Sequence, residues 1–253
     1  MRMLRLGLAL LLLTALPARA AIDIQVVTSD GGLTAWLVEE RAIPFTALEL
    51  RFKGGASLDA EGKRGAIHLM TALLEEGAGE MDAQEFAAAA DRLAAEFSFD
   101  VRDDALSVSA RFLTENRDAA LDLLKLALTE PRFDPDAIER VRAQVLSGIA
   151  SDAKDPNAIA SRTFDRLAFG DHPYGSPLEG TEASVSVLTR DDIVAAHARV
   201  IARDRVHAAA AGDTGAEALG AMLDDLLGDL PATGAPMPKD APWLLEGGVT
   251  VVD

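Results

Sequence analysis

The chain has 253 residues, of which 49% are hydrophobic and 26% are charged, a composition typical of a globular protein with a sizeable core. Its 41 acidic residues outnumber its 24 basic ones and give a formal net charge of -17. This balance argues against a nucleic-acid partner and against electrostatic binding to anionic lipid, because both require a basic surface.

The first residues have the pattern of a secretory signal peptide, here assigned to 1–20. Arg2 and Arg5 precede an apolar run over 6–16, and Ala18-Arg19-Ala20 provides a small-x-small cleavage site. The run is too short to span a bilayer, and an uncleaved anchor is the alternative interpretation. The chain has no cysteine, which excludes disulfides and suits a compartment where free thiols are oxidised. These features predict a periplasmic protein.

We expect cleavage after Ala20, so that the mature chain begins at Ala21. Mass spectrometry of the N-terminus of the protein purified from its native host checks this expectation. A chain that still begins at Met1, or a cytoplasmic location, would contradict it.

The part of the chain that follows begins with alternating apolar and polar residues. Asp30-Gly31-Gly32 supplies the residue types of a tight turn, which predicts a hairpin. Asp82 with Glu85 forms a capping-box pattern at the start of an alanine-rich helix. In this region strands are expected at 22–27, 33–38 and 45–52, and helices at 63–75 and from 83 to about 95.

The remaining part continues to mix hairpins with helices. Pro131 ends one expected helix, and Pro135 and Pro156 each open another. Strands are expected at 97–101, 105–112 and 206–211, and helices at 115–128, 136–150, 156–169, 190–200 and 216–230. This order predicts the α+β fold class for a domain over 21–230, with an antiparallel sheet flanked by helices rather than a doubly wound parallel sheet.

The last residues have a different composition. Residues 231–248 are rich in proline and glycine, which is typical of a linker. Residues 249–252 are expected to begin a strand. We therefore interpret 249–253 as the start of a second domain.

The most informative motif lies at 65–77, which reads Gly-Ala-Ile-His-Leu-Met-Thr-Ala-Leu-Leu-Glu-Glu-Gly. It resembles the zinc-binding helix of the M16 family of peptidases (insulinases and processing peptidases), in which Gly-x-x-His-x-x-Glu-His places two zinc ligands and a general base on one helix. In that frame His68 takes the first ligand position, Thr71 the base position and Ala72 the second ligand position. Zinc takes nitrogen, sulfur or carboxylate ligands, so alanine offers none and threonine is a poor replacement for the base.

The third zinc ligand of that family is a glutamate on a later helix. This chain matches the surrounding residues of that helix but lacks the glutamate. Within the helix expected at 136–150, the frame that starts at Glu139-Arg140 has Ser147 and Gly148 where the family has carboxylates. Glu75 lies about 10 Å along the helix axis from His68, too far to share one metal ion with it. The other histidines, at 172, 197 and 207, lack ligand spacing. We therefore expect no metal site, and we interpret His68 as a polar residue on a core-facing helix.

A second match supports the same family. Residues 171–181 read Asp-His-Pro-Tyr-Gly-Ser-Pro-Leu-Glu-Gly-Thr and resemble a His-Pro-Tyr-Gly-x-Pro-x-x-Gly-Thr loop of M16 proteins. The resemblance runs from about residue 22 to the last residue. We interpret this loop as structural, because proline and glycine fix its path, and we expect Tyr174 to pack.

The resemblance implies a function as well as a fold. M16 proteins consist of two similar α+β halves that close over a chamber, and many act as pairs in which one member carries zinc. By this resemblance the chain is expected to be a non-catalytic subunit without a cofactor of its own, inactive alone, that helps a zinc-bearing M16 homologue degrade unfolded peptides. The alternatives are a standalone peptide-binding or scaffold protein, and a truncated product without function. The sequence identifies no substrate-binding residue.

Overall fold

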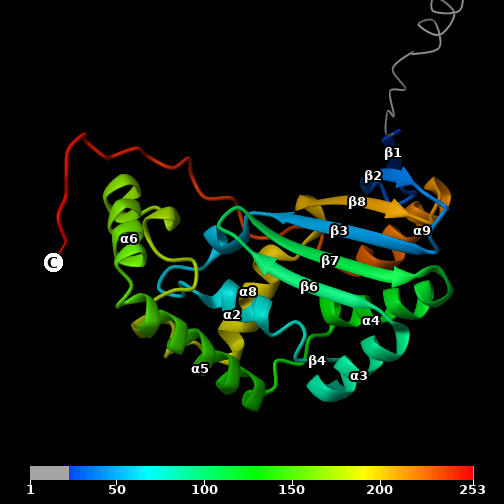
Figure 1. Ribbon diagram of the computed structural model, residues 1–253, viewed down its shortest axis with the longest axis horizontal. Coiled ribbons are helices and arrows are strands. Elements are labelled where there is room, and N and C mark those ends of the chain that lie inside the picture. Colours follow the sequence, from blue (N-terminus) through cyan, green and yellow to red (C-terminus); the bar gives the residue numbers. More distant parts are fainter. Residues whose placement is uncertain (1–22, 253) are drawn as a thin grey trace, which may run out of the picture.

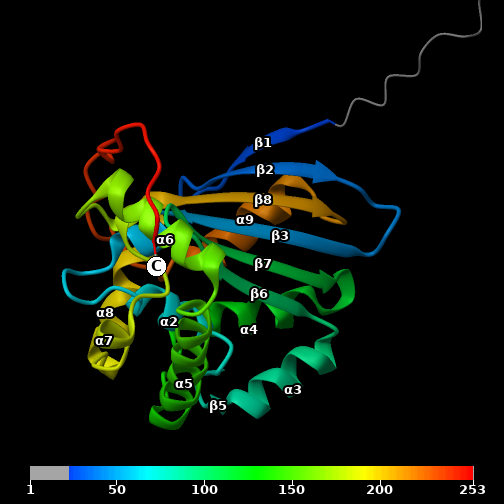
Figure 2. The same ribbon diagram turned by 60° about the vertical axis from the view of Figure 1, so that its left-hand side comes forward.

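The computed structural model describes residues 23–252, so the expected signal peptide lies outside the described residues. Figures 1 and 2 show a twisted sheet with helices α4 and α9 packed along one side of it and the helices α2, α5 and α8 gathered at one end. This is the α+β architecture that the sequence predicts. No helix within 23–252 combines the length and the apolar character needed to cross a bilayer.

The main sheet has six strands in the order β1-β2-β8-β3-β7-β6. Adjacent strands of this sheet pair antiparallel, except β2 and β8, which pair parallel. The expectation of an antiparallel sheet therefore holds for all but this pair. The strands are β1 (Gln25–Thr28), β2 (Thr34–Glu39), β3 (Phe45–Lys53), β6 (Glu96–Val101), β7 (Ala105–Leu113) and β8 (Val206–Gly212).

The helices agree with the sequence pattern where a local signal marks their starts. Asp82 accepts hydrogen bonds from the backbone of Gln84 and Glu85, and the Glu85 side chain accepts one from the Asp82 backbone, which confirms the predicted capping box. The helices are α2 (Ala66–Ala72), α3 (Ala83–Leu93), α4 (Arg117–Thr129), α5 (Pro135–Asp152), α6 (Pro156–Phe169), α7 (Glu182–Val185), α8 (Arg190–Val200) and α9 (Ala216–Leu227). A short hairpin of β4 (Gly77–Ala78) and β5 (Met81–Asp82) separates α2 from α3.

Helix α2 is shorter than the expected 63–75. Gly65 precedes it with a φ of 94°, a left-handed conformation in which a Cβ would lie 2.5 Å from the backbone oxygen of Glu179. At the other end, residues 73–76 form turns before Gly77, which has a φ of 112°. The two glycines of the motif therefore fix where the chain enters and leaves this helix.

The strand expected at 249–252 is not present. Residues 249–252 belong to no helix or strand and pair with no neighbouring strand, and Val249 is 93% exposed. A strand needs a hydrogen-bonded partner, so apolar alternation alone does not produce one. The preceding segment has no helix or strand and lies against α6, where Trp243 packs edge-on against Phe164 and Phe169.

The core lies between one face of the sheet and the helices. The sheet contributes large buried side chains such as Leu50, Phe52 and Phe112, and α2 contributes Ile67 and Met70. The opposite face of the sheet keeps large apolar side chains exposed, as described below.

Candidate functional site

Helix α2 packs against α5, α8 and β6 and carries the first part of the candidate site. His68 is partly buried, and its Nδ1 atom is buried without a hydrogen-bond partner among the described residues. Burial lowers the pKa of His68 below its ordinary value, although the charges of Glu179 and Asp100 oppose this effect. The imidazole is therefore neutral at neutral pH.

The two other motif positions on α2 cannot supply the missing chemistry. Thr71 is only 3% exposed, and its hydroxyl donates a hydrogen bond to the backbone oxygen of Ile67 at 2.7 Å. It is bound to its own helix and does not face solvent. Ala72, the last residue of α2, is exposed and has no donor atom.

Two arginines fix helix α5, one to the segment that follows α2 and the other to the end of α7 and the turn after it. Arg140 donates two hydrogen bonds to the carboxylate of Glu76, at 2.8 and 2.7 Å. Arg142 is buried and donates to the backbone oxygens of Val185 and Leu188 at 2.6 and 2.8 Å. The contact of Arg140 with Glu76 supports the family frame, because it holds the later helix next to the segment that follows the motif helix.

The later positions on α5 present no ligand. Ser147 and Gly148 are both exposed, and a Cβ added to Gly148 would meet no atom within 4 Å. Among residues 23–252, no three histidine, aspartate or glutamate side chains are grouped so that they could hold a metal ion. Of the five motif positions, only His68 therefore carries a usual zinc ligand.

Gly148 gives a direct test of its local environment. Gly148→Ala is expected to raise the free energy of unfolding by about 0.5–1 kcal/mol, because alanine favours the helix interior and the added methyl group meets nothing. Gly65→Ala is the matched control and is expected to destabilise by about 1–3 kcal/mol, since Gly65 has a positive φ and a close backbone neighbour. Urea unfolding of both variants measures the two effects. A destabilised Gly148→Ala would contradict the prediction that the added methyl group meets no other atom.

Arg64 connects several segments through hydrogen bonds that the sequence does not indicate. Arg64, immediately before α2, donates to the backbone oxygen of Ala56 at 2.5 Å and to the carboxylate of Asp103 at 2.7 Å. It also donates to the backbone oxygens of Pro173 and Ser176, at 3.1 and 3.0 Å. One guanidinium group thus joins the start of α2 to the β6–β7 turn and to the loop over 170–181.

Tyr174 packs within that loop, as expected. The ring of Tyr174 lies edge-on to Phe169 and to His172, and its hydroxyl donates a hydrogen bond to Asp104. This hydrogen bond is the main cause that raises the pKa of Tyr174 to about 12. The proline-glycine loop therefore serves to close the end of the domain next to Arg64.

Asp59 caps the motif helix from a distance in sequence. Its side chain is 5% exposed, and its two oxygens accept hydrogen bonds from the backbone of Gly65 and Ile67, each at 2.8 Å. The cap comes from outside the adjacent residues, so the spacing of Ncap motifs could not reveal it. Burial raises the pKa of Asp59 to about 6, against the lowering effect of these hydrogen bonds and of Arg64.

Asp59 is expected to make stability depend on pH. In the folded protein the Asp59 carboxyl group keeps its proton up to about pH 6, whereas in the unfolded chain it loses the proton near pH 3.8. Between these pH values the folded protein therefore binds more protons than the unfolded chain. The free energy of unfolding should therefore fall as pH rises from 4 to 6, by up to about 3 kcal/mol. Urea unfolding across this range measures the fall, and Asp59→Asn should remove the Asp59 share of it. An equal slope in both proteins would contradict the assignment.

Comparisons with known proteins agree with this geometry. The profile of the family described as "Insulinase (Peptidase family M16)" matches residues 36–182. A Helicobacter pylori protein named "Non-peptidase homolog YmxG" is 28% identical over 193 residues, which cover 76% of this chain and 45% of that protein. A Mycobacterium tuberculosis protein named "Uncharacterized zinc protease" is 30% identical over 164 residues, covering 65% of this chain and 37% of that protein.

Two solved structures extend the comparison to the fold. A peptidase M16 inactive domain from Pseudomonas fluorescens matches with a TM-score of 0.82 and 27% identity, over 87% of this chain and 54% of that one. A protease from Helicobacter pylori matches with a TM-score of 0.74 and 18% identity, over 88% and 54%, and shares the fold. The chain spans about half the length of these relatives.

Proposed function

The chain belongs to the insulinase family, peptidase family M16, and we propose that it is a non-catalytic member that assists a zinc-bearing partner in degrading unfolded peptides in the periplasm. In the complex with this partner, the chain contributes part of the folded protein surface. The partner contributes the zinc ion and the general base.

One observation carries the proposal: the frame of the zinc site is kept while its chemistry is missing. Of the motif positions on α2, only His68 offers a donor atom, because Thr71 is buried and Ala72 is apolar. On α5, Ser147 and Gly148 are exposed and carry no carboxylate. Losses on two separate helices that are still held next to each other indicate a domain kept for a purpose other than metal-dependent hydrolysis.

The relatives support the remaining parts of the proposal. The names of two of them describe a non-peptidase homologue and an inactive domain, while another is named as a zinc protease. Proteins named as peptidases and proteins named as inactive thus both occur among those similar to this chain. The pattern of residues 1–20 supports export to the periplasm.

A reconstitution experiment tests the proposal. The purified chain, a zinc-bearing M16 homologue from the same organism, and their mixture are each incubated with an unfolded peptide that carries a fluorophore and a quencher. We expect no cleavage by the chain alone and faster cleavage by the mixture than by the homologue alone. His68→Ala in the chain should leave the rate of the mixture unchanged, because His68 takes no part in the reaction.

Two results would overturn the proposal. Cleavage by the chain alone that stops with a chelator and with His68→Ala would show a catalytic metal site in it. A mixture that is no faster than the homologue alone, over a range of concentrations of the chain, would show that the chain gives no assistance to that partner.

A further inference from the structure

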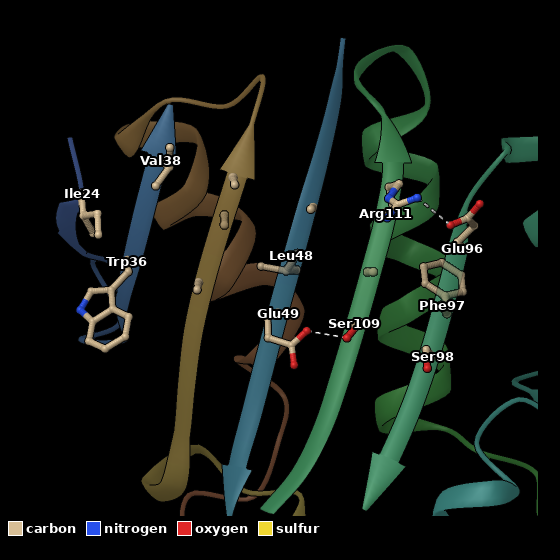
Figure 3. A pocket seen from close by; sticks show the side chains of 15 residues that line it. Ile24, Trp36, Val38, Leu48, Glu49, Glu96, Phe97, Ser98, Ser109 and Arg111 are labelled. Carbon is tan, nitrogen blue, oxygen red and sulfur yellow. Dashed lines mark hydrogen bonds and ion pairs between the residues drawn. The ribbon is translucent and has the colours of Figure 1, made fainter. Parts of the chain in front are cut away.

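The side of the sheet shown in Figure 3 carries charged side chains that have partners within the sheet. Glu49 accepts a hydrogen bond from the hydroxyl of Ser109, and Arg111 pairs with Glu96 at 3.2 Å. Towards β2 and β1 the exposed side chains are apolar instead, and Trp36 is 63% exposed. The charged groups on β3, β6 and β7 that the figure labels therefore need no further partner.

A second group of polar side chains lies where β2 and β8 begin, and its members lack such partners. Arg51 on β3 lies directly opposite His207 on β8, and Arg203 lies in the short turn before β8. All three side chains are exposed. Within residues 23–252, none of them has an ion-pair partner within 4.0 Å. Both guanidinium groups are charged at any physiological pH, so this corner of the sheet carries positive charge that the fold does not neutralise.

The carboxylates that could neutralise these cations pair with other residues. Asp204 follows Arg203 in the chain, but it pairs with the buried Arg205 at 3.0 Å. Asp100 lies in the same row of the sheet as Arg51, two strands away, and it pairs with an arginine of the β6–β7 turn at 3.2 Å. Since the chain has 41 acidic and 24 basic residues, a shortage of carboxylates does not explain the unpaired arginines.

The unpaired side chains line a cavity of about 490 Å³ at this corner of the sheet. Thr34 and Trp36 of β2 line it as well, together with apolar residues such as Leu33 and Ala208. Small-molecule sites in proteins typically measure about 300–1,000 Å³ and combine apolar walls with a few polar groups that converge on the ligand. The cavity therefore has the size and the lining of a ligand site, and its charge selects an anion.

We propose that this cavity binds a carboxylate group carried on an apolar body. Arg51 and Arg203 pair with the carboxylate, because a guanidinium group matches its two oxygens with parallel hydrogen bonds. His207 donates a further hydrogen bond, since an imidazole has a ring N–H whether it is neutral or charged. The indole of Trp36 packs on the apolar body. A bare inorganic anion would leave Trp36 without a contact, so free phosphate fits the lining less well.

Two sources supply a carboxylate of this kind: the C-terminus of a peptide, and a small organic acid. Both offer the charge and the apolar body, and only the peptide adds main-chain amide groups. The peptide as the source rests on the proposed function, because a chain that assists in peptide degradation meets peptides with free C-termini. The carboxylate site itself rests on the unpaired arginines and on the cavity that they line.

The fluorescence of Trp36 reports on binding. The chain has two tryptophans, so Trp243→Phe leaves Trp36 as the single indole. This variant is titrated with the peptide N-acetyl-alanyl-leucyl-phenylalanine, with the same peptide amidated at its C-terminus, with hydrocinnamate and with inorganic phosphate. We expect a blue shift of the emission with the peptide acid, about tenfold weaker binding of the amide, and no shift with phosphate. Hydrocinnamate that binds as tightly as the peptide acid assigns the cavity to small acids, and weaker binding assigns it to peptide C-termini.

Variants in the same Trp243→Phe background test the two arginines. Arg51→Gln and Arg203→Gln should each weaken binding of the peptide acid about tenfold and leave binding of the amide unchanged. Arg111→Gln is the matched control, because it removes an exposed arginine of the same sheet that already pairs with Glu96, and it should change neither affinity. The replaced side chains are exposed, so the variants should keep the fold, which circular dichroism checks.

Several results would overturn the proposal. They are equal binding of the peptide acid and the amide, a shift with phosphate as large as that with the peptide acid, no shift with any probe, and an unchanged preference for the acid in both arginine variants. The assay contains no peptidase, so its failure leaves the proposed function standing, and a failed reconstitution leaves the carboxylate site standing.

Discussion

Arg64→Ala is expected to lower the free energy of unfolding by about 3–5 kcal/mol. The Arg64 side chain is 14% exposed and serves three backbone oxygens as well as the carboxylate of Asp103. Truncation would leave the carboxylate of Asp103 and the backbone oxygen of Ser176 without this donor, and a second carboxylate, that of Asp59 at 3.6 Å, without its nearest cation. The cost is therefore that of uncompensated buried polar groups and not only that of a lost ion pair.

Two control variants separate this effect from ordinary charge removal. Arg102→Ala removes an exposed cation paired with Asp100, and its cost should stay below about 1 kcal/mol. Arg64→Lys keeps the charge but cannot donate in several fixed directions at once, so it should still be clearly destabilising. Urea unfolding at pH 7 measures all three variants. If Arg64→Ala and Arg102→Ala lower the free energy of unfolding by equal, small amounts, the hydrogen bonds of Arg64 do not stabilise the fold as proposed.

The elements that could be predicted from the sequence are those marked by local chemistry. The hairpin of β1 and β2 follows from the glycine-rich turn, and the start of α3 follows from the spacing of Asp82 and Glu85. In each case the residues that determine the structure are a few positions apart. Periodicity then identifies the buried side of each element.

The features that could not be predicted depend on residues far apart in the chain. The parallel pairing of β2 with β8 joins Ala35 to Ala208, and nothing in either strand specifies the other. The N-terminal cap of α2 comes from Asp59 and not from the adjacent residues, so α2 begins later than its apolar pattern indicates. Propensity gives the type of an element, whereas its tertiary neighbours determine its ends.

In the candidate site, too, the locally marked features can be predicted and those set by distant contacts cannot. The frame set by Gly65 and Gly77 predicts the positions of the motif, and both glycines have a positive φ in the structure. The sequence does not indicate Arg64 and Arg142 as the side chains that hold the region together. Most arginines are exposed, and no sequence pattern separates the few that are buried with several acceptors.

Ala72→His combined with a glutamate on α5 is expected to give the chain stoichiometric zinc binding, with a Kd of about 1 μM or below, where the wild type binds none. His68 and the new histidine would lie four residues apart on one side of α2, and the carboxylate would come from the neighbouring helix. Thr71 is left unchanged, because it is buried and a glutamate there would place a carboxylate in the core. The base is not needed for binding.

Only one of the two positions on α5 can serve, which gives the experiment an internal control. Ser147 and Gly148 are neighbours in sequence, and so about 100° apart around the helix axis. We therefore expect zinc binding from either Ala72→His/Ser147→Glu or Ala72→His/Gly148→Glu, but not from both. Isothermal titration with zinc measures the affinity, and His68→Ala in the better variant should abolish it.

The outcome also decides whether the family frame is correctly placed on this chain. The contact between Arg140 and Glu76 holds α5 beside the segment after α2, but Ser147 lies about 10 Å further along α5. Zinc binding that depends on His68 would show that this part of α5 faces the motif helix. If both double variants stay folded and neither binds zinc, α5 does not face His68. The positions at 147 and 148 would then not be remnants of a zinc site, and the case for a non-catalytic member would depend on Thr71 and Ala72 alone.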